Sequence, residues 1–515
     1  MRALMSVYDK TGLEELARYL LEMGVELIST GGTEEFLRDA GLAVRSVQDV
    51  TGFPEMLGGR VKTLHPAIYA GILARRDEMK DISELDQHGF TPIDIVVCNL
   101  YPFIEGVRDP ATTTEQAVEL IDIGGVTLLR AAAKNFKHVL TVCDPSDYAE
   151  VMDGLRKPGG LRDDTRQRLA AKAFQHCAVY DSCIASYLGT DGDLFPQTFT
   201  VAIEKVKSFR YGENPHQLAA LYRDFSSRRE PGSVVEAEQL HGMAPAYNNT
   251  FDLDMAWGMV RDFSAPTIAV VNHGNPCGLA CDANLAEAFR RALECDPQAA
   301  FGGAVAFNRP IDRAAAEEIA PVFFEDIIAP GYSLEALELL RGKPDLRVMR
   351  APVPNGRVAS GQLVDLDYRR VTGGFLVQTR DSVPEGALAR DVVTTRHPTL
   401  EEVTSLLFGW RAVKHVRSHA IVLARKLGLV AVGAGQPSRA DAVELACTKA
   451  GARALGSVMA SDGFLLFPDA VERAAEAGVT AIIQPGGSSR DEQVIEAANH
   501  AHMAMIFTHQ RHYHH

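Results

Sequence analysis

The sequence has 515 residues, more than one hydrophobic core usually supports, so we expect at least two domains. The formal net charge of −15 argues against nucleic-acid binding, which needs a basic face, but an acidic protein can still hold a small anion in a locally positive pocket. No apolar stretch approaches the length of a membrane span, and the eight cysteines are scattered rather than spaced as a disulfide framework. This balance predicts a cytoplasmic metabolic enzyme with neither nucleic-acid nor membrane partners.

The first part of the chain alternates strand and helix patterns. Leucines recur at helical spacing between residues 13 and 21, and apolar runs at 3–7, 25–29, 93–98 and 139–143 predict strands. This alternation predicts a parallel sheet with helices on both faces and ligands at the carboxyl ends of its strands.

The second part begins after a predicted helix over residues 165–188, which ends at a polar, Gly-rich segment, 189–193, where we place the domain boundary. Further strands are predicted at 267–271, 429–432 and 480–483. This part is long enough for one large domain or for two similar halves, and the sequence shows no repeat of fixed period.

Two early loops, 6–11 and 30–33, have the character of phosphate-binding turns between a strand and a helix. Glycine lets the backbone approach an anion, and a helix N-terminus offers free N–H donors. A Gly-Gly pair at such a turn is equally common as ordinary turn chemistry. The sequence contains neither a Walker loop nor a strong dinucleotide fingerprint, so neither a nucleoside triphosphate nor NAD is predicted.

The run 58–66 places two cations and an imidazole, Arg60, Lys62 and His65, within six residues. In an extended conformation Arg60 and Lys62 would point to the same side. A solvated basic loop is the alternative interpretation of this run. Tyr101 follows a predicted strand, where a parallel sheet displays its functional groups.

The segments 6–12, 58–66, 98–103 and 121–135 closely resemble the IMP cyclohydrolase domain of the bifunctional AICAR formyltransferase/IMP cyclohydrolase family, where AICAR is aminoimidazole carboxamide ribonucleotide. The resemblance implies a cyclohydrolase domain over 1–195 with a parallel-sheet, methylglyoxal-synthase-like fold. Formyl-AICAR closes its own ring, so the protein must mainly orient it and stabilise the developing oxyanion. The resemblance implies Lys62 for the oxyanion, and Tyr101, Asp122 and Lys134 for protons and orientation. The substrate-binding residues that it implies are Ser6, Lys10, Thr30, Gly31, Gly32, Thr33, Arg60, Thr63 and Asn99.

The segments 208–217, 270–278, 300–303, 327–332, 433–439, 484–489 and 511–515 resemble the formyltransferase domain of the same family. The resemblance implies a larger α/β domain over 200–515, built of two cytidine-deaminase-like halves, and a homodimer with shared transferase sites. Formyl transfer from 10-formyltetrahydrofolate, a co-substrate, to AICAR needs a general base, and His273 takes that role by the resemblance. No metal is implied. The implied AICAR-binding residues are Arg210, Tyr211, Asn272, Gly302, Glu325, His419, Arg439 and Phe464, and the implied folate-binding residues are Ala440, Ser488 and Ser489.

Two positions depart from the family pattern, which has Lys-His where this chain has Asn272-His273 and usually has Asn where this chain has His419. An amide cannot supply the charge of an ammonium to a transition state. We hypothesise that the two changes compensate, with His419 providing a proton donor that Asn272 cannot provide. A transferase domain that has degenerated beside a working cyclohydrolase is the alternative.

Two other functions compete with this interpretation. A zinc-dependent deaminase is suggested by Cys277 and Cys281, but three residues separate them instead of two, and the segment around His273 lacks the required glutamate. A regulatory nucleotide-binding protein that has kept the fold and lost the chemistry is the non-enzymatic alternative. The set Lys62, Tyr101, Asp122 and Lys134 argues against it for the first domain only.

Overall fold

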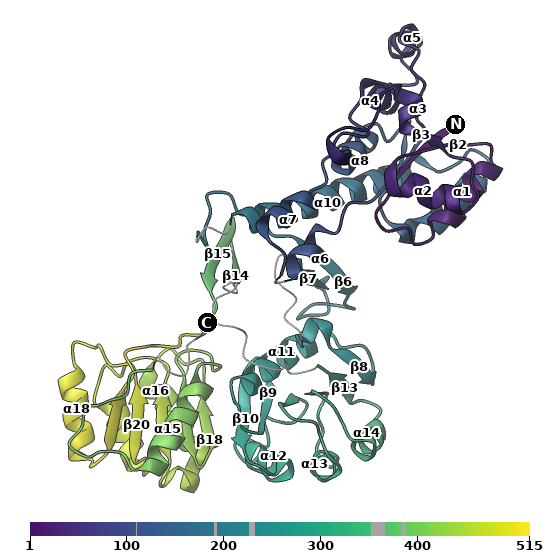
Figure 1. Cartoon of the computed structure of the whole chain (residues 1–515). Coiled ribbons are helices and arrows are strands. Elements are labelled where there is room, and N and C mark those ends of the chain that lie inside the picture. The colour runs from purple at the N-terminus through teal and green to yellow at the C-terminus, as the bar shows by residue number, and fades with distance from the viewer. Residues whose placement is uncertain (110, 190–192, 226–231, 352–365, 383–387) are drawn as a thin grey trace. The chain divides into compact units, whose positions relative to one another are not determined.

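The computed structural model describes residues 1–515 except 110, 190–192, 226–231, 352–365 and 383–387 (Figure 1). The chain forms two compact units, the first comprising Met1–Glu204 with Asp224–Arg228 and the second Lys205–Arg223 with Arg229–His515. Residues 190–192 of the predicted boundary segment lie outside the described residues. Within the described part of the chain, every helix is too short or too polar to cross a membrane.

Unit 1 is built on a five-stranded parallel sheet with the strand order β3-β2-β1-β4-β5. The apolar runs that predicted strands form four of the five, because each supplies the nearly continuous hydrophobic sequence that a strand buried on both faces requires. The strands are β1 (Arg2–Ser6), β2 (Glu26–Ser29), β3 (Arg45–Ser46), β4 (Ile95–Cys98) and β5 (Leu140–Val142).

Helices cover both faces of this sheet, as the alternation predicted. Ala3 and Met5 of β1 pack in one buried cluster with helices α1 (Leu13–Glu22), α2 (Gly31–Asp39) and α9 (Tyr148–Arg156). Leu4, between them, packs on the other face with α4 (Pro66–Leu73), α8 (Gly124–Lys134) and α10 (Asp163–Leu188). The remaining helices of the unit are α3 (Val47–Thr51), α5 (Met79–Gln87), α6 (Phe103–Arg108) and α7 (Thr114–Glu119), with the 3-10 turns η1 (Leu57–Gly59) and η2 (Pro145–Asp147).

Unit 2 contains a twelve-stranded mixed sheet with the order β16-β21-β20-β19-β17-β18-β10-β9-β11-β12-β13-β8. Its strands are β8 (Glu238–His241), β9 (Thr267–Asn272), β10 (Asn275–Cys281), β11 (Ala304–Phe307), β12 (Asp326–Ala329), β13 (Arg347–Arg350), β16 (Asp391–Val392), β17 (Ile421–Arg425), β18 (Gly428–Gly433), β19 (Val458–Ser461), β20 (Ala481–Gln484) and β21 (Ala504–Phe507). Two separate two-stranded ribbons pair β6 (Ile203–Ser208) with β7 (Ala220–Asp224) and β14 (Leu366–Val371) with β15 (Gly374–Thr379).

The twelve strands divide into two halves with the same element order, which decides between the two possibilities that the sequence left open. In each half an edge strand and a helix precede a hairpin, and three helix–strand pairs follow. The sheet order of one half mirrors that of the other across the β18–β10 junction. The helices are α11 (Tyr247–Arg261), α12 (Leu285–Leu293), α13 (Arg313–Ile319) and α14 (Leu334–Arg341) in the first half, and α15 (Leu400–Val413), α16 (Arg439–Ala450), α17 (Asp469–Glu476) and α18 (Asp491–His500) in the second; the short turns η3 (Val234–Glu236) and η4 (Gly451–Ala454) complete the unit.

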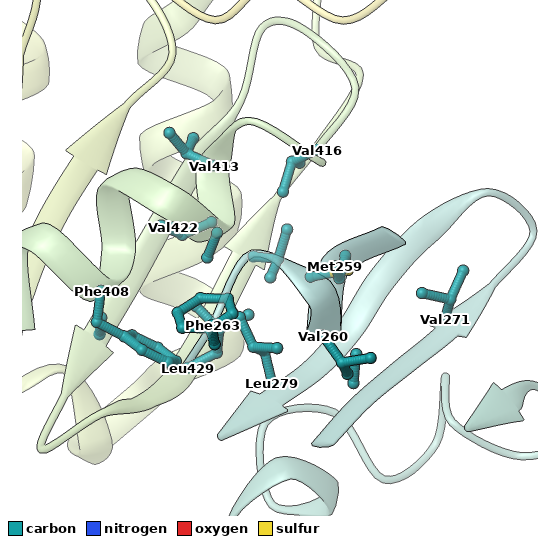
Figure 2. Close-up of a cluster of buried hydrophobic side chains, with 14 of the residues drawn as sticks. Met259, Val260, Phe263, Val271, Leu279, Phe408, Val413, Val416, Val422 and Leu429 are labelled. Atoms are coloured by element: carbon teal, nitrogen blue, oxygen red, sulfur yellow. The ribbon is translucent and has the colours of Figure 1, made fainter. Parts of the chain in front are cut away.

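A shared core joins the two halves on the face that α11 and α15 cover. Side chains such as Val260 and Phe263 from the first half meet Phe408 and Val422 from the second in one buried cluster (Figure 2). The rings of Phe263 and Phe408 lie 5.4 Å apart. The other face is covered separately in each half, by α12 to α14 and by α16 to α18. The halves therefore fold as one sheet with one continuous central core.

Candidate active sites

In unit 1 the carboxyl ends of β2, β1 and β4 lie side by side, and two buried side chains shape the loop that follows β1. Asn99 accepts hydrogen bonds from the N–H groups of Tyr8 (2.7 Å) and Asp9 (3.0 Å) and donates to the carbonyl of Asp9 (2.9 Å). Thr33 accepts from the N–H of Val7 (3.0 Å) and donates to its carbonyl (2.9 Å). These two predicted substrate-binding residues direct their polar atoms at the protein, so they fix the loop.

Lys62 lies at the N-terminus of α2, against the second predicted phosphate loop. Its ammonium is 3.0 Å from the carboxylate of Glu55. A Cβ atom on Gly31 would come within 2.9 Å of this ammonium, and one on Gly59 within 2.7 Å of the neighbouring carbon. Both glycines also have positive φ, 54° and 95°. Glycine at these two positions gives the lysine its place beside the helix terminus.

Arg60 does not adopt the extended conformation in which it would share a side with Lys62. The 3-10 turn η1 ends just before Arg60, which has helical backbone angles (φ −65°, ψ −24°) instead of extended ones. Its guanidinium pairs with Glu119 and is well exposed. Glycine at positions 58 and 59 permits this turn, and the turn removes the strand alternation that the expectation assumed.

Asp122 joins the cluster around Lys62 from the N-terminus of α8. Its carboxylate accepts from the N–H of Gly125 (2.8 Å), and its own N–H donates to the hydroxyl of Tyr180 (2.9 Å). Burial raises the pKa of Asp122, and hydrogen bonds from Gly125, Tyr101 and Gly124 and the charge of Lys62 oppose that rise. The structure thus brings Lys62, Asp122 and the backbone of Tyr101 together.

The other predicted residues of unit 1 lie at varying distances from this cluster. The ring of Tyr101 packs edge-on against Tyr8, 5.7 Å between centroids, and is 45% exposed. Ser6 is the last residue of β1, and Thr30 directly precedes α2. The ammonium of Lys10 lies 3.4 Å from the carbonyl oxygen of Tyr8. Lys134 occupies the opposite end of α8 from Gly124, about 15 Å along the helix axis. Within one chain, Lys134 is therefore not brought to Lys62 and Asp122.

Three residues that contact this site were missed by the sequence analysis. Glu55 pairs with Lys62, and Tyr180, a residue of α10, holds the backbone of Asp122. Tyr69 lies on α4 near Thr63, and burial raises its pKa to about 12. Glu55 and Tyr69 carried a weak local signal, because they lie close to the two ends of the 58–66 run, whereas Tyr180 carried none.

In unit 2 one edge of the sheet collects the predicted transferase residues, and we call it the site edge. The β9–β10 turn lies there. The strand registers place the start of β11 on one side of this turn, and the end of β18, the start of β17 and the end of β19, in that order, on the other side. Because β12 and β13 run parallel to β11, their starts lie on this edge too, as do the ends of β20 and β21. The predicted residues at these strand ends, in the adjoining loops or in the first turn of the following helix are Asn272, His273, Gly302, Glu325, His419, Arg439, Ala440, Phe464, Ser488 and Ser489.

Arg210 and Tyr211 belong to the segment that packs beside the N-terminus of α11. Phe209 contacts Tyr247 edge-on with ring centroids 6.0 Å apart. Asn248 donates a hydrogen bond to the carbonyl of Glu213 (3.3 Å). This end of α11 also carries the group that holds Glu325, so the segment lies on the same side of the unit as the predicted AICAR contacts.

A carboxylate pair forms the first-half part of the site edge. The side-chain amide of Asn249, on α11, donates to both Glu325 (2.8 Å) and Asp326 (2.7 Å). Arg347 approaches the same two carboxylates at 3.5 and 3.7 Å. Asp326 is almost fully buried, and that burial raises its pKa to about 7 despite the opposing charge of Arg347. Asn249 thereby orients Glu325 at the start of β12.

His273 and Asn272 differ in how firmly their side chains are held. The imidazole of His273 is exposed at the hairpin turn. The amide of Asn272 donates to the carbonyl of Ala299 (2.8 Å), which ties the end of β9 to the loop before Gly302. Asn272 therefore supports the loop on which Gly302 lies.

A chain of side chains orients His419 in the second half. The guanidinium of Arg439 donates to Nδ1 of His419 (2.8 Å) and also pairs with the fully buried Asp462. Because arginine can only donate, Nδ1 is the acceptor and the neutral imidazole carries its proton on Nε2. Burial and the charge of Arg439 lower the pKa of His419, and Asp462 opposes the shift. His419 is thus held as a neutral N–H donor.

The C-terminal residues close this part of the site edge. Ser418 donates its N–H to the carbonyl of His514 (2.9 Å), and the N–H of His514 donates to the hydroxyl of Ser418 (3.0 Å). Tyr513 lies against Gly463, with its ring 6.3 Å from that of His419. The tail therefore forms a wall beside His419.

The two cysteines that suggested zinc lie in a buried strand. Cys277 and Cys281 belong to β10, burial raises the pKa of both thiols, and the sulfur of Cys281 is 3.1 Å from the hydroxyl of Thr267. Among the residues that the structure describes, no three or more His, Cys, Asp or Glu side chains group as metal ligands would.

Comparison with known proteins identifies the class and then the family. Residues 12–127 match the model of the MGS-like domain. The class of protein is therefore a two-unit α/β enzyme, with an MGS-like domain on a parallel sheet followed by a larger mixed α/β unit. Residues 132–449 match the model described as the AICARFT/IMPCHase bienzyme, and the chain belongs to this family. It is 46% identical, over 100% of its length and 99% of the relative's, to the bifunctional purine biosynthesis protein PurH of Bacillus cereus (strain 03BB102), and 47% identical over the same shares to that of Bacillus mycoides (strain KBAB4). A solved structure described as ForH is 41% identical over 37% of this chain and 98% of its own, with a TM-score of 0.34.

Proposed function

We propose that this chain catalyses the last two steps toward IMP, with the cyclohydrolase in residues 1–195 and the AICAR formyltransferase in residues 200–515. The observation that carries the proposal is the convergence of the predicted residues of each activity within its own unit. Lys62, Asp122 and the backbone of Tyr101 meet in unit 1. In unit 2, His273, Glu325 and His419 share one sheet edge.

Ring closure needs an electrophile for the formyl oxygen and a group that accepts and returns protons. The ammonium of Lys62 is anchored by Glu55 and can stabilise the oxyanion that forms when the carboxamide nitrogen attacks. Asp122, whose pKa is raised by burial, is suited to exchange a proton during loss of water. The N-terminus of α2, with Gly31 and Gly32, offers N–H groups to the phosphate.

Formyl transfer needs a base for the weakly nucleophilic amine of AICAR. His273 is exposed on the site edge and takes this role in the proposal. His419 lies on the same edge and carries its ring proton on Nε2, which supports the hypothesis that it compensates for Asn272. The co-substrate of the proposed reaction is 10-formyltetrahydrofolate, with Ala440, Ser488 and Ser489 lining its site. We further propose a cytoplasmic homodimer that needs no metal.

Two assays on the unmodified chain test this function. In one the protein receives AICAR and 10-formyltetrahydrofolate, and in the other it receives formyl-AICAR alone. We expect IMP in both. Binding of AICAR without IMP in either assay would instead indicate a regulatory nucleotide-binding protein. IMP in the assay with formyl-AICAR but not in the assay with AICAR would indicate a degenerate transferase unit.

A further inference from the structure

The hairpin between β9 and β10 has a histidine at a turn position with positive φ. Its two residues, His273 and Gly274, both have positive φ, 52° and 68°, and the flanking Asn272 and Asn275 pair directly. Such a turn suits the twist of a hairpin, but positive φ is unfavourable for a histidine. The position of the imidazole therefore depends on neighbouring groups that stabilise this backbone conformation.

Asp252, on α11, holds this turn with both oxygens of its carboxylate. One oxygen accepts from the N–H of His273 (3.0 Å) and the other from the N–H of Gly274 (2.7 Å). Burial raises the pKa of Asp252, and the two N–H donors and the charge of a protonated His273 act against that rise. The carboxylate is therefore coupled to His273 both through the backbone and through space.

The second half of the unit contains the same turn without the carboxylate. Lys426 and Leu427 join β17 to β18 with φ of 48° and 59°. Ser405, at the position of α15 that corresponds to Asp252 of α11, accepts one hydrogen bond from the N–H of Lys426 (3.2 Å). This turn is held by that hydroxyl together with Arg291, which donates to the carbonyl of Lys426, and the N–H of Cys281, which donates to the carbonyl of Leu427. A turn of this shape therefore forms where a hydroxyl stands in place of the carboxylate of Asp252.

We propose that Asp252 is a positioning residue for His273 in formyl transfer, an inference that rests on the function proposed above. In the reaction the amine nitrogen of AICAR bonds to the formyl carbon, the imidazole takes the amine proton, the bond from that carbon to N10 of the folate breaks, and N10 receives a proton. Asp252 fixes the direction of the imidazole and sets a negative charge beside the ring that becomes positive.

The other charged groups near the turn do not replace Asp252. Arg417 has a guanidinium nitrogen 3.6 Å from where a Cβ of Gly274 would lie, and its charge has the opposite sign to that of Asp252. Glu325, at the start of β12, interacts electrostatically with Asp252 and is already hydrogen-bonded to Asn249. Asp252 is the charged side chain of α11 that hydrogen-bonds to both N–H groups of the turn.

The test compares Asp252→Asn with Ser405→Ala in the full-length chain. Asparagine keeps the shape of aspartate but removes the charge and sets an NH2 group against one of the two N–H donors. We expect kcat for formyl transfer to fall about 10- to 100-fold in Asp252→Asn while KM for AICAR changes less than about twofold. Ser405→Ala removes the corresponding hydrogen bond from the other turn and should leave kcat within about twofold.

A second variant, Asp252→Ser, separates an effect on stability from an effect on catalysis. If Asp252→Asn lowers the thermal stability of unit 2, Asp252→Ser, which copies the other turn, should restore the stability but not kcat. Unchanged kcat in a folded Asp252 variant, a rise in KM alone, or an equal loss in Ser405→Ala would overturn the proposal. If the unmodified chain transfers no formyl group, the proposed function itself fails, which is a different result.

Discussion

The two halves of unit 2 have one architecture but contribute different parts to the site edge. The first half supplies the β9–β10 turn and the starts of β11 to β13, and the second supplies the end of β18, the start of β17 and the ends of β19 to β21. The first half carries the exposed His273, whereas the second carries a histidine whose ring is fixed by Arg439. One architecture thus yields an asymmetric edge, because corresponding strands of the two halves run in opposite directions and carry different side chains there.

The first prediction, with the greatest expected effect, concerns Asp326, a buried acid at a position where the second half has an alanine. Asp326 begins β12, whereas Ala481 begins β20, the corresponding strand of the second half. Its pKa in the folded protein is about 7, against 3.8 as its ordinary value, so between these pH values the folded state holds a proton that the unfolded state has lost. The free energy of unfolding should therefore fall as pH rises from about 4 to about 7, by at most roughly 4 kcal/mol.

Replacing Asp326 by asparagine should remove this dependence on pH, because an amide does not titrate. The amide oxygen can still accept the hydrogen bond from Asn249. Denaturant unfolding of both proteins at pH 5 and pH 8 measures it. The fluorescence of Trp257 and Trp410, the two tryptophans of the chain, reports on unit 2, to which both belong. If the unmodified protein and Asp326→Asn show the same dependence on pH, Asp326 does not give the first half the pH-dependent stability described here.

A smaller effect is expected from the two departures from the family pattern, one in each half. Asn272→Lys and His419→Asn each restore the family residue alone, and we expect each to change the formyltransferase rate by about tenfold, because each disturbs a compensating pair. The rate with AICAR and 10-formyltetrahydrofolate measures this, and the cyclohydrolase rate of the same preparations is the control. Two unaltered transferase rates would rule out compensation.

The sequence predicted the strands and their ends well, because the apolar runs and the turn glycines that define them are local. Ile95–Cys98 and Thr267–Asn272 lie where they were expected, and the residues that follow them reach the predicted edges. The conformation of Arg60 could not be predicted, because two glycines allow a 3-10 turn before it that hydrophobic periodicity does not reveal.

The partners of the site residues were beyond sequence reasoning. Asp252 meets the turn of His273, and Asp462 meets Arg439, only after the strands and helices have packed. The residue pattern did not show the repeat, and the two halves were expected only from the resemblance to the family. The matching tryptophans of α11 and α15, Trp257 and Trp410, were the available signal.

The central claim is that two separate sites in one chain perform the two reactions. The most direct measurement compares Lys62→Ala and His273→Ala in both half-reactions, formyl transfer to AICAR and closure of formyl-AICAR. We predict that Lys62→Ala slows closure by about 100-fold or more and leaves transfer within about twofold, and that His273→Ala does the reverse. A variant that slows both reactions equally, or neither, would contradict the account.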